Sequence, residues 1–222
     1  MSTQWTLHSR TSAELRARIG AAWAKFHSLW PLLGKRDGNL SQKLRVFDAS
    51  VTQTVLWCSE SWLLTVKEKR LLVTTQNRML RRIAGPGRRP EEPWVDWIRR
   101  STRAARKHAE HAGIRFWLDS HLKAKWCWAG HVARMQPARL ACRSLKWRDS
   151  AWWKTEVQGF PTSLRMHRPH RTRWFRWEDD LKRYASDSGW ESWQTVAQQR
   201  DHHGDASKWL GHCKGFVKTM KK

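Results

Sequence analysis

The sequence is poor in several features, and each shortage argues against a class of protein. No run of 18 apolar residues occurs, so no segment has the length of a membrane-spanning helix. The first 30 residues contain no apolar core and already include arginine, which argues against a secretory signal. No CxxC pair occurs, so a disulfide scaffold or a standard zinc ribbon is disfavoured for the four scattered cysteines, Cys58, Cys127, Cys142 and Cys213.

Motifs of enzyme chemistry are also missing. The sequence has neither a GxSxG nucleophile motif nor a Gly-rich phosphate loop. Asp179 and Asp180 follow Trp177 in a way that superficially resembles the aromatic-x-Asp-Asp turn of polymerases. Two-metal catalysis needs such carboxylates on a tight strand turn, with a further Asp on a neighbouring strand, whereas this pair lies in a helix-periodic segment. The sequence therefore predicts no catalytic residue and no cofactor.

The cysteines and histidines give a weak metal signal. Cys127 and His131 stand four residues apart on one predicted helix, and Cys142, His167 and His170 follow at a distance. A tetrahedral zinc site needs four ligands held together, while a buried thiol and a hydrogen-bonded histidine explain the same residues without a metal. We predict no metal site, and the sequence leaves open whether Cys127, His131 and Cys142 bind one.

Positive charge and tryptophan are abundant. Lys and Arg number 43 against 19 Asp and Glu, which gives a formal net charge of +24 and favours a polyanionic partner. There are 18 Trp against one Tyr, and arginine outnumbers lysine by 27 to 16. GC-rich codon usage explains both biases, and so does a surface that stacks bases and captures phosphates in bidentate fashion. Most of the tryptophans stand at helix-periodic positions, so we expect core packing for each one.

Apolar residues recur at steps of three and four along most of the chain, which predicts an all-α or nearly all-α fold. We expect an irregular bundle of about six to eight helices, with a basic loop before the penultimate helix. Helix starts are indicated by three capping-box spacings, at Thr11 with Glu14, Thr65 with Glu68 and Ser188 with Glu191. Three Pro and two Gly within 85–93 indicate a linker. The predicted organisation is a helical region over 1–84, the linker, and a basic helical region over 94–222.

Arginine is concentrated in three clusters along the chain. The third cluster, Arg165 to Arg176, lies in a stretch that has no acidic residue between Val157 and Glu178. A solvated helix face normally mixes charges, so we predict phosphate contacts that do not read bases. A coherent electropositive strip is expected. The first choice of phosphate-binding residues is Arg165, Arg168, Arg171, Arg173 and Arg176, followed by Arg78, Arg81, Arg82, Arg88 and Arg89, while the remaining cluster is Arg99, Arg100, Arg103, Arg106 and Lys107.

The order of several short motifs resembles the region after the palm in reverse transcriptases of non-LTR (LINE-type) retrotransposons. The similarity covers about residues 13–201. The matching stretches are Glu14–Ile19 with Ala22–Phe26, Lys43–Ala49, Glu60–Thr65, Asn77–Gly85, Trp128–Met135, and Pro169 with Arg171–Leu181. Trp57, Cys58 and Ser59 depart from the Gly and Cys that often precede the Glu of the Glu-x-Trp block.

The resemblance implies a thumb and C-terminal portion of an RNA-directed DNA polymerase, in which residues 13–84 grip template and primer. The palm and fingers of such an enzyme would be partners that lie N-terminal to this region, so the chain on its own is not expected to polymerise. RNA, DNA or both are the expected ligands, and the family implies an intracellular, nuclear location. Two alternatives stay open: a stand-alone helix-turn-helix DNA-binding protein, and a degenerate retroelement remnant without activity.

Overall fold

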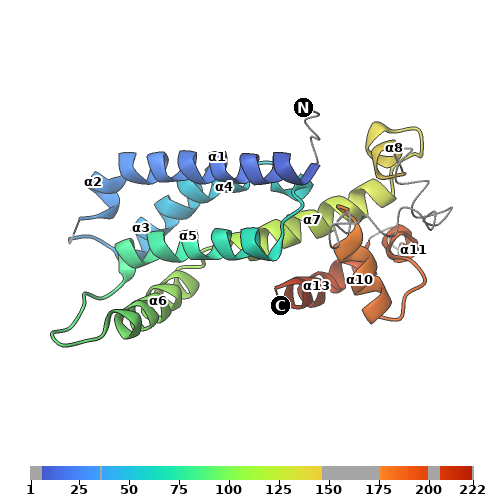
Figure 1. Cartoon of the computed structure of the whole chain (residues 1–222). Coiled ribbons are helices and arrows are strands. Elements are labelled where there is room, and N and C mark those ends of the chain that lie inside the picture. The colour runs from blue at the N-terminus through green and yellow to red at the C-terminus, as the bar shows by residue number, and fades with distance from the viewer. Residues whose placement is uncertain (1–6, 36, 147–175, 200–205, 222) are drawn as a thin grey trace, which may run out of the picture. The chain divides into compact units, whose positions relative to one another are not determined.

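The computed structural model describes residues 7–35, 37–146, 176–199 and 206–221. Every regular element in these ranges is helical, which confirms the predicted fold class (Figure 1). The helices outnumber the predicted six to eight, partly because short segments such as α2 (Trp30–Leu33) and α4 (Gln53–Leu56) stand between longer ones. The predicted basic loop before the penultimate helix lies outside the described residues. None of the described helices combines the length and the apolar character that crossing a membrane requires.

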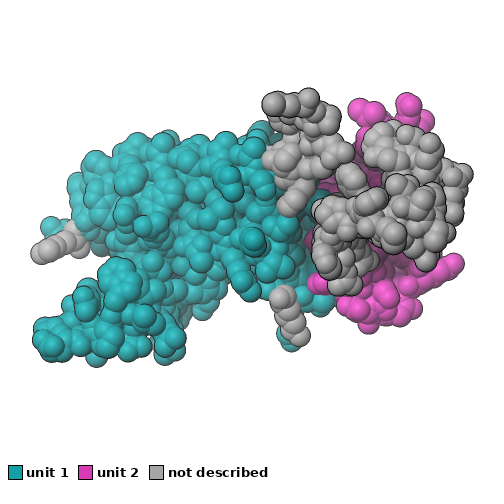
Figure 2. Space-filling view, viewed as in Figure 1, with its two compact units in different colours: residues 1–125, 214–222 teal, residues 126–213 magenta. Residues whose placement is uncertain are grey.

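The chain divides into two compact units, coloured separately in Figure 2. Unit 1 comprises Met1–Lys125 and Lys214–Lys222, and unit 2 comprises Trp126–Cys213. The segment 85–93 lies inside unit 1, between α5 (Val66–Ala84) and α6 (Trp94–His111), which pack against each other. A functional division at this segment stays a prediction.

In unit 1, α1 (Leu7–Ser28) lies along α4 and α5 (Figure 1). Its side chains Leu15, Ala22 and Phe26 are fully buried and form its inner face. These residues follow the helical periodicity that the sequence predicts. A π-helical turn at Asp48–Thr52 joins α3 (Leu40–Phe47) to α4. The helix extends past the predicted cap at Thr11 to Leu7, since residues 7–11 include neither Pro nor Gly and capping-box spacing alone does not stop a helix.

The start of α5 carries the capping box that the sequence predicts. The Thr65 hydroxyl accepts from the Glu68 N–H at 3.3 Å, and the Glu68 carboxylate accepts from the Thr65 N–H at 2.7 Å. The carboxylate is buried and also accepts a hydrogen bond from Ser12 on α1. One acidic residue therefore caps α5 and fixes its start against α1.

Buried polar side chains anchor α7 (Trp117–Ala133) at its start, in unit 1. The Gln76 amide accepts from the Trp117 N–H at 2.9 Å and donates to the Arg115 carbonyl at 2.8 Å. The Trp117 indole donates to the Thr52 hydroxyl at 2.8 Å. Also in unit 1, Lys69 donates to the carbonyl of Met220 at 3.1 Å, which holds the end of α13 (Cys213–Met220).

Unit 2 is built around two stacked tryptophans, Trp126 on α7 and Trp209 on α12 (Ser207–Gly211). Their rings are 3.7 Å apart and 6° from parallel, and each indole N–H donates to the other residue's carbonyl, at 3.0 and 3.1 Å. Gly130 gives them room, because a Cβ there would lie 2.7 Å from Cδ1 of Trp209. The glycine that interrupts the predicted helix is thus explained by close packing.

Three further helices complete the described part of unit 2: α8 (Leu140–Lys146), α10 (Asp179–Asp187) and α11 (Trp193–Gln198). Leu181 and Tyr184 of α10 are buried. The last predicted capping box is wrong, since the hydroxyl of Ser192, rather than Ser188, accepts from a backbone N–H of α11. The tryptophans divide in their burial: Trp117, Trp126, Trp193 and Trp209 are core, whereas Trp57 and Trp94 are 67% and 60% exposed.

Candidate nucleic-acid interface

The last two turns of α5 present arginines to different neighbours. Arg78 and Arg82 are exposed, and their guanidinium carbons lie 5.9 and 5.1 Å from the ring centroid of Trp23 on α1. Arg81 points toward α6 and donates to the Thr102 hydroxyl at 2.9 Å. Burial and the charge of Arg78 lower the pKa of Arg81 from its ordinary value. Arg78 and Arg82 therefore remain accessible to an anion, while Arg81 joins α5 to α6.

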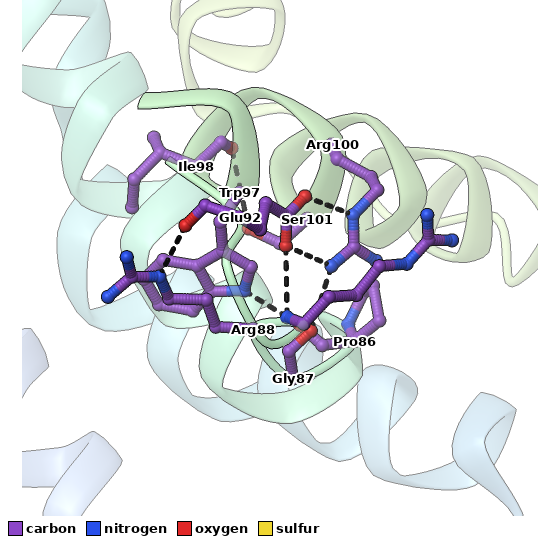
Figure 3. Close-up of polar contacts among 9 residues, drawn as sticks. Pro86, Gly87, Arg88, Glu92, Trp97, Ile98, Arg100 and Ser101 are labelled. Carbon is purple, nitrogen blue, oxygen red and sulfur yellow. Dashed lines mark hydrogen bonds and ion pairs between the residues drawn. The ribbon is translucent and has the colours of Figure 1, made fainter. Parts of the chain in front are cut away.

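The segment 85–93 is an ordered turn organised by Glu92 (Figure 3). The Glu92 carboxylate accepts two 2.7 Å hydrogen bonds from Arg100 of α6 and one of 3.1 Å from the Arg89 backbone N–H. The Glu92 carbonyl accepts from Nε of Arg88 at 2.7 Å. Arg100 also donates to the Gly87 carbonyl at 2.9 Å. This basic turn, residues 85–93, thus holds the side chain of Arg88 and the backbone of Arg89 at the surface.

The ion pair with Arg100 of α6 changes the ionisation of Glu92. Its hydrogen bonds from Arg100 lower the pKa of the Glu92 carboxyl from 4.5 to about 2, and the same bonds raise the pKa of Arg100. The indole of Trp97 adds a hydrogen bond to the Pro86 carbonyl at 3.0 Å. Glu92 is therefore an anion at neutral pH, and its charge is paired with that of Arg100 on α6.

The outer face of α6 carries Arg99, Arg103 and Lys107, four residues apart, and all three are exposed. Arg99 approaches Asp96 at 3.7 Å, in an exposed pair that contributes little to stability. Arg106 points inward, with its guanidinium carbon 4.0 Å from the Phe116 ring centroid. Two members of this predicted cluster, Arg100 and Arg106, are thus used within unit 1.

An open depression of about 420 Å³ lies in unit 1, where one of its lining residues, Arg82, lies over Trp23. His27, Trp30 and Arg82 line it, and none of these described lining residues is acidic. The rings of Trp23 and His27 are stacked at 5.7 Å, with 27° between their planes. Sequence reasoning missed this aromatic and cationic surface, since Trp23 reads as a core position. The recurrence of Trp23, His27 and Trp30 at steps of four and three is the signal that could have indicated it.

The third arginine cluster falls mostly outside the described residues, which applies to Arg165, Arg168, Arg171 and Arg173. The remaining member, Arg176, uses its guanidinium within unit 2. It lies 3.3 Å from the buried carboxylate of Glu178 and donates to the Leu145 carbonyl at 3.1 Å. A phosphate-binding role for this cluster stays a prediction, and for Arg176 it would compete with these contacts.

Asp179 stands at the start of α10, where its carboxylate accepts from the Arg176 N–H at 2.8 Å, as an acidic residue at a helix N-terminus does. Glu178 and Lys182, four residues apart, form an ion pair at 2.9 Å. The Cys142 thiol is buried and donates to the Val132 carbonyl at 3.2 Å, while Cys127 and His131 are exposed. Over the described ranges, no three His, Cys, Asp or Glu side chains are grouped to hold a metal ion.

Comparison with known proteins gives one informative similarity. The chain is 26% identical over 208 residues to a putative uncharacterized transposon-derived protein of Caenorhabditis elegans. The match covers 90% of this chain and 66% of that protein, so the chain spans just under two thirds of its relative's length. No family model and no solved structure matches the chain. The similarity indicates a transposon-related origin.

Proposed function

We propose that the chain is a nucleic-acid-binding part of a retrotransposon reverse transcriptase, and that unit 1 contacts template and primer phosphates without reading bases. The order of the sequence motifs supports the parent enzyme, and the similarity to a transposon-derived protein agrees with it at a coarser level. Catalysis is assigned to the palm of that parent and not to this chain.

The observation that carries the proposal is the charge left on α5, the basic turn and α6. Residues 66–111 contain 13 Lys and Arg against five Asp and Glu. Two of these acids are engaged inside the fold: Glu68 is buried in the capping box, and Glu92 forms an ion pair with Arg100. Among the described residues, no carboxylate forms an ion pair with the side chains of Arg78, Arg82, Arg88, Arg103 or Lys107.

Each cation that neutralises a duplex phosphate releases counterions and contributes about −0.9 to the slope of log affinity against log salt. Five such contacts predict a slope of about −4 to −5. The test is fluorescence anisotropy of the full chain with a blunt DNA duplex and an RNA–DNA hybrid over a salt series. Affinity should be insensitive to single-base changes, and a slope near zero would refute the phosphate role.

Charge variants locate the surface. Arg103→Gln with Lys107→Gln should reduce the slope by about two, because two phosphate contacts are lost. Arg16→Gln, on an exposed position of α1 outside this surface, is the control for a general loss of charge and should leave the slope nearly unchanged. An equal effect per charge at both places would indicate non-specific attraction and contradict the proposed surface.

The two alternative functions, a helix-turn-helix DNA-binding protein and a degenerate retroelement remnant, predict different results. A helix-turn-helix protein joins its helices by a turn of three or four residues, whereas α5 and α6 are joined by residues 85–93. Strong discrimination in a single-base substitution series would favour that alternative. A decayed remnant would lose cooperative thermal melting, which circular dichroism measures.

A further inference from the structure

We propose that the depression lined by His27, Trp30 and Arg82 binds one unpaired nucleotide of a nucleic-acid strand. The base would stack on Trp30, and Arg82 would hold the adjoining phosphate. This inference rests on the proposed function and deepens it, because it adds a preference for single-stranded ends to the general attraction for phosphate.

Trp30 is a supported platform. Its indole lies over Gly34, where a Cβ would come within 2.7 Å of Cε2 of the ring. The buried ring of Phe26 lies 5.5 Å from it, centroid to centroid. With these supports, 39% of Trp30 is still exposed. A ring fixed in this way stacks on a base without losing further side-chain freedom.

The cations beside Trp30 are equally well placed. Arg82 lines the depression while its guanidinium lies over Trp23, and Arg78 approaches the same ring. A guanidinium attracted to the face of an indole ring keeps N–H groups that can donate to phosphate oxygens. The depression thus combines a stacking ring with phosphate donors, and no acidic residue is among its described lining residues.

The ligand is an unpaired nucleotide because the bases of a duplex are already stacked within the helix. A volume of about 420 Å³ lies in the range of small-molecule sites. Stacking of one base on an aromatic side chain typically changes affinity by about fivefold to 150-fold.

The test compares three ligands at one salt concentration by fluorescence anisotropy. They are a blunt duplex, the same duplex with a short single-stranded extension, and the duplex with an extension of abasic nucleotides. The abasic extension adds the same phosphates without bases. The intact chain should bind the base-containing extension at least about fivefold more tightly than the abasic one. Equal affinity for the two extensions would overturn the inference.

Variants assign this ratio to the depression. Trp30→Ala should bring the ratio close to one, and Gly34→Ala should lower it without touching the ligand, because the new methyl displaces the indole. Trp57→Ala removes another exposed tryptophan of unit 1 and should leave the ratio unchanged. Circular dichroism establishes that each variant is folded. A ratio that survives both Trp30→Ala and Gly34→Ala would place stacking elsewhere.

The experiment distinguishes failure of the proposed function from failure of the nucleotide site. If the blunt duplex binds without salt dependence, the proposed function fails. If it binds with the expected slope but the base-containing extension adds nothing, only the nucleotide site fails.

Discussion

Gly130→Ala gives a severe test of the packing in unit 2. Gly130 is buried in α7, and an added Cβ would lie 2.7 Å from Cδ1 of Trp209 and closer still to its indole nitrogen. Trp209 is fully buried and stacked on Trp126, and the indole N–H of each residue donates a hydrogen bond to the carbonyl of the other. The ring has no exposed direction in which to move, so the substitution must break this arrangement.

The magnitude follows from three effects. Overpacking a close-packed core costs about 1–3 kcal/mol. Displacement of Trp209 weakens two hydrogen bonds worth about 1 kcal/mol each. Alanine in place of glycine within a helix recovers about 1 kcal/mol. We therefore expect the free energy of unfolding of unit 2 to fall by about 2–4 kcal/mol.

Urea unfolding followed by circular dichroism measures this loss, and Gly20→Ala is the matched control. Gly20 also lies within a helix, α1, but no atom stands within 4 Å of its added Cβ. That variant should be stabilised by about 0.5–1 kcal/mol. If Gly130→Ala were stabilised as well, the close approach of Gly130 and Trp209 would be refuted.

Three further predictions concern the remaining features. Thr65→Ala should destabilise unit 1 by about 1 kcal/mol in urea unfolding, because it removes the cap of α5. The lowered pKa of Glu92 stabilises the fold above pH 4.5, and this contribution is lost as pH falls toward about 2; Glu92→Gln should flatten that part of the pH–stability curve. EDTA should leave the melting temperature unchanged, because the Cys142 thiol donates its hydrogen bond to the Val132 carbonyl. A lower melting temperature in EDTA would show a stabilising metal.

Helical structure was predictable because it depends on local spacing. The stripe of Leu15, Ala22 and Phe26 and the box of Thr65 and Glu68 are visible within a few residues of sequence, and the structure contains both. The predicted helix starts at Thr11 and Ser188 were less accurate, since the structure places these starts at Leu7 and after Ser192. Several Ser, Thr and Asn residues compete near each boundary, and the choice depends on how the chain enters the helix.

The character of the segment 85–93 was not predictable in the same way. Three prolines and two glycines are typical of a linker, and the sequence gives no local sign that Glu92 binds Arg100 eight residues later. That pairing forms because α6 packs back against α5 and brings Arg100 beside the turn. Order in this segment is therefore a tertiary effect.

The division of arginines into structural and available ones explains why charge counting is insufficient to locate a binding surface. Arg81 and Arg82 are neighbours in sequence, but a helix turns by about 100° per residue, so one bonds to Thr102 and the other lies over Trp23. In the same way Arg100 and Arg106 serve contacts within unit 1, while Arg103 between them faces solvent. The count of 43 Lys and Arg therefore overstates the number of cations that can contact a nucleic acid, and the number of phosphate contacts must be taken from the salt dependence of binding.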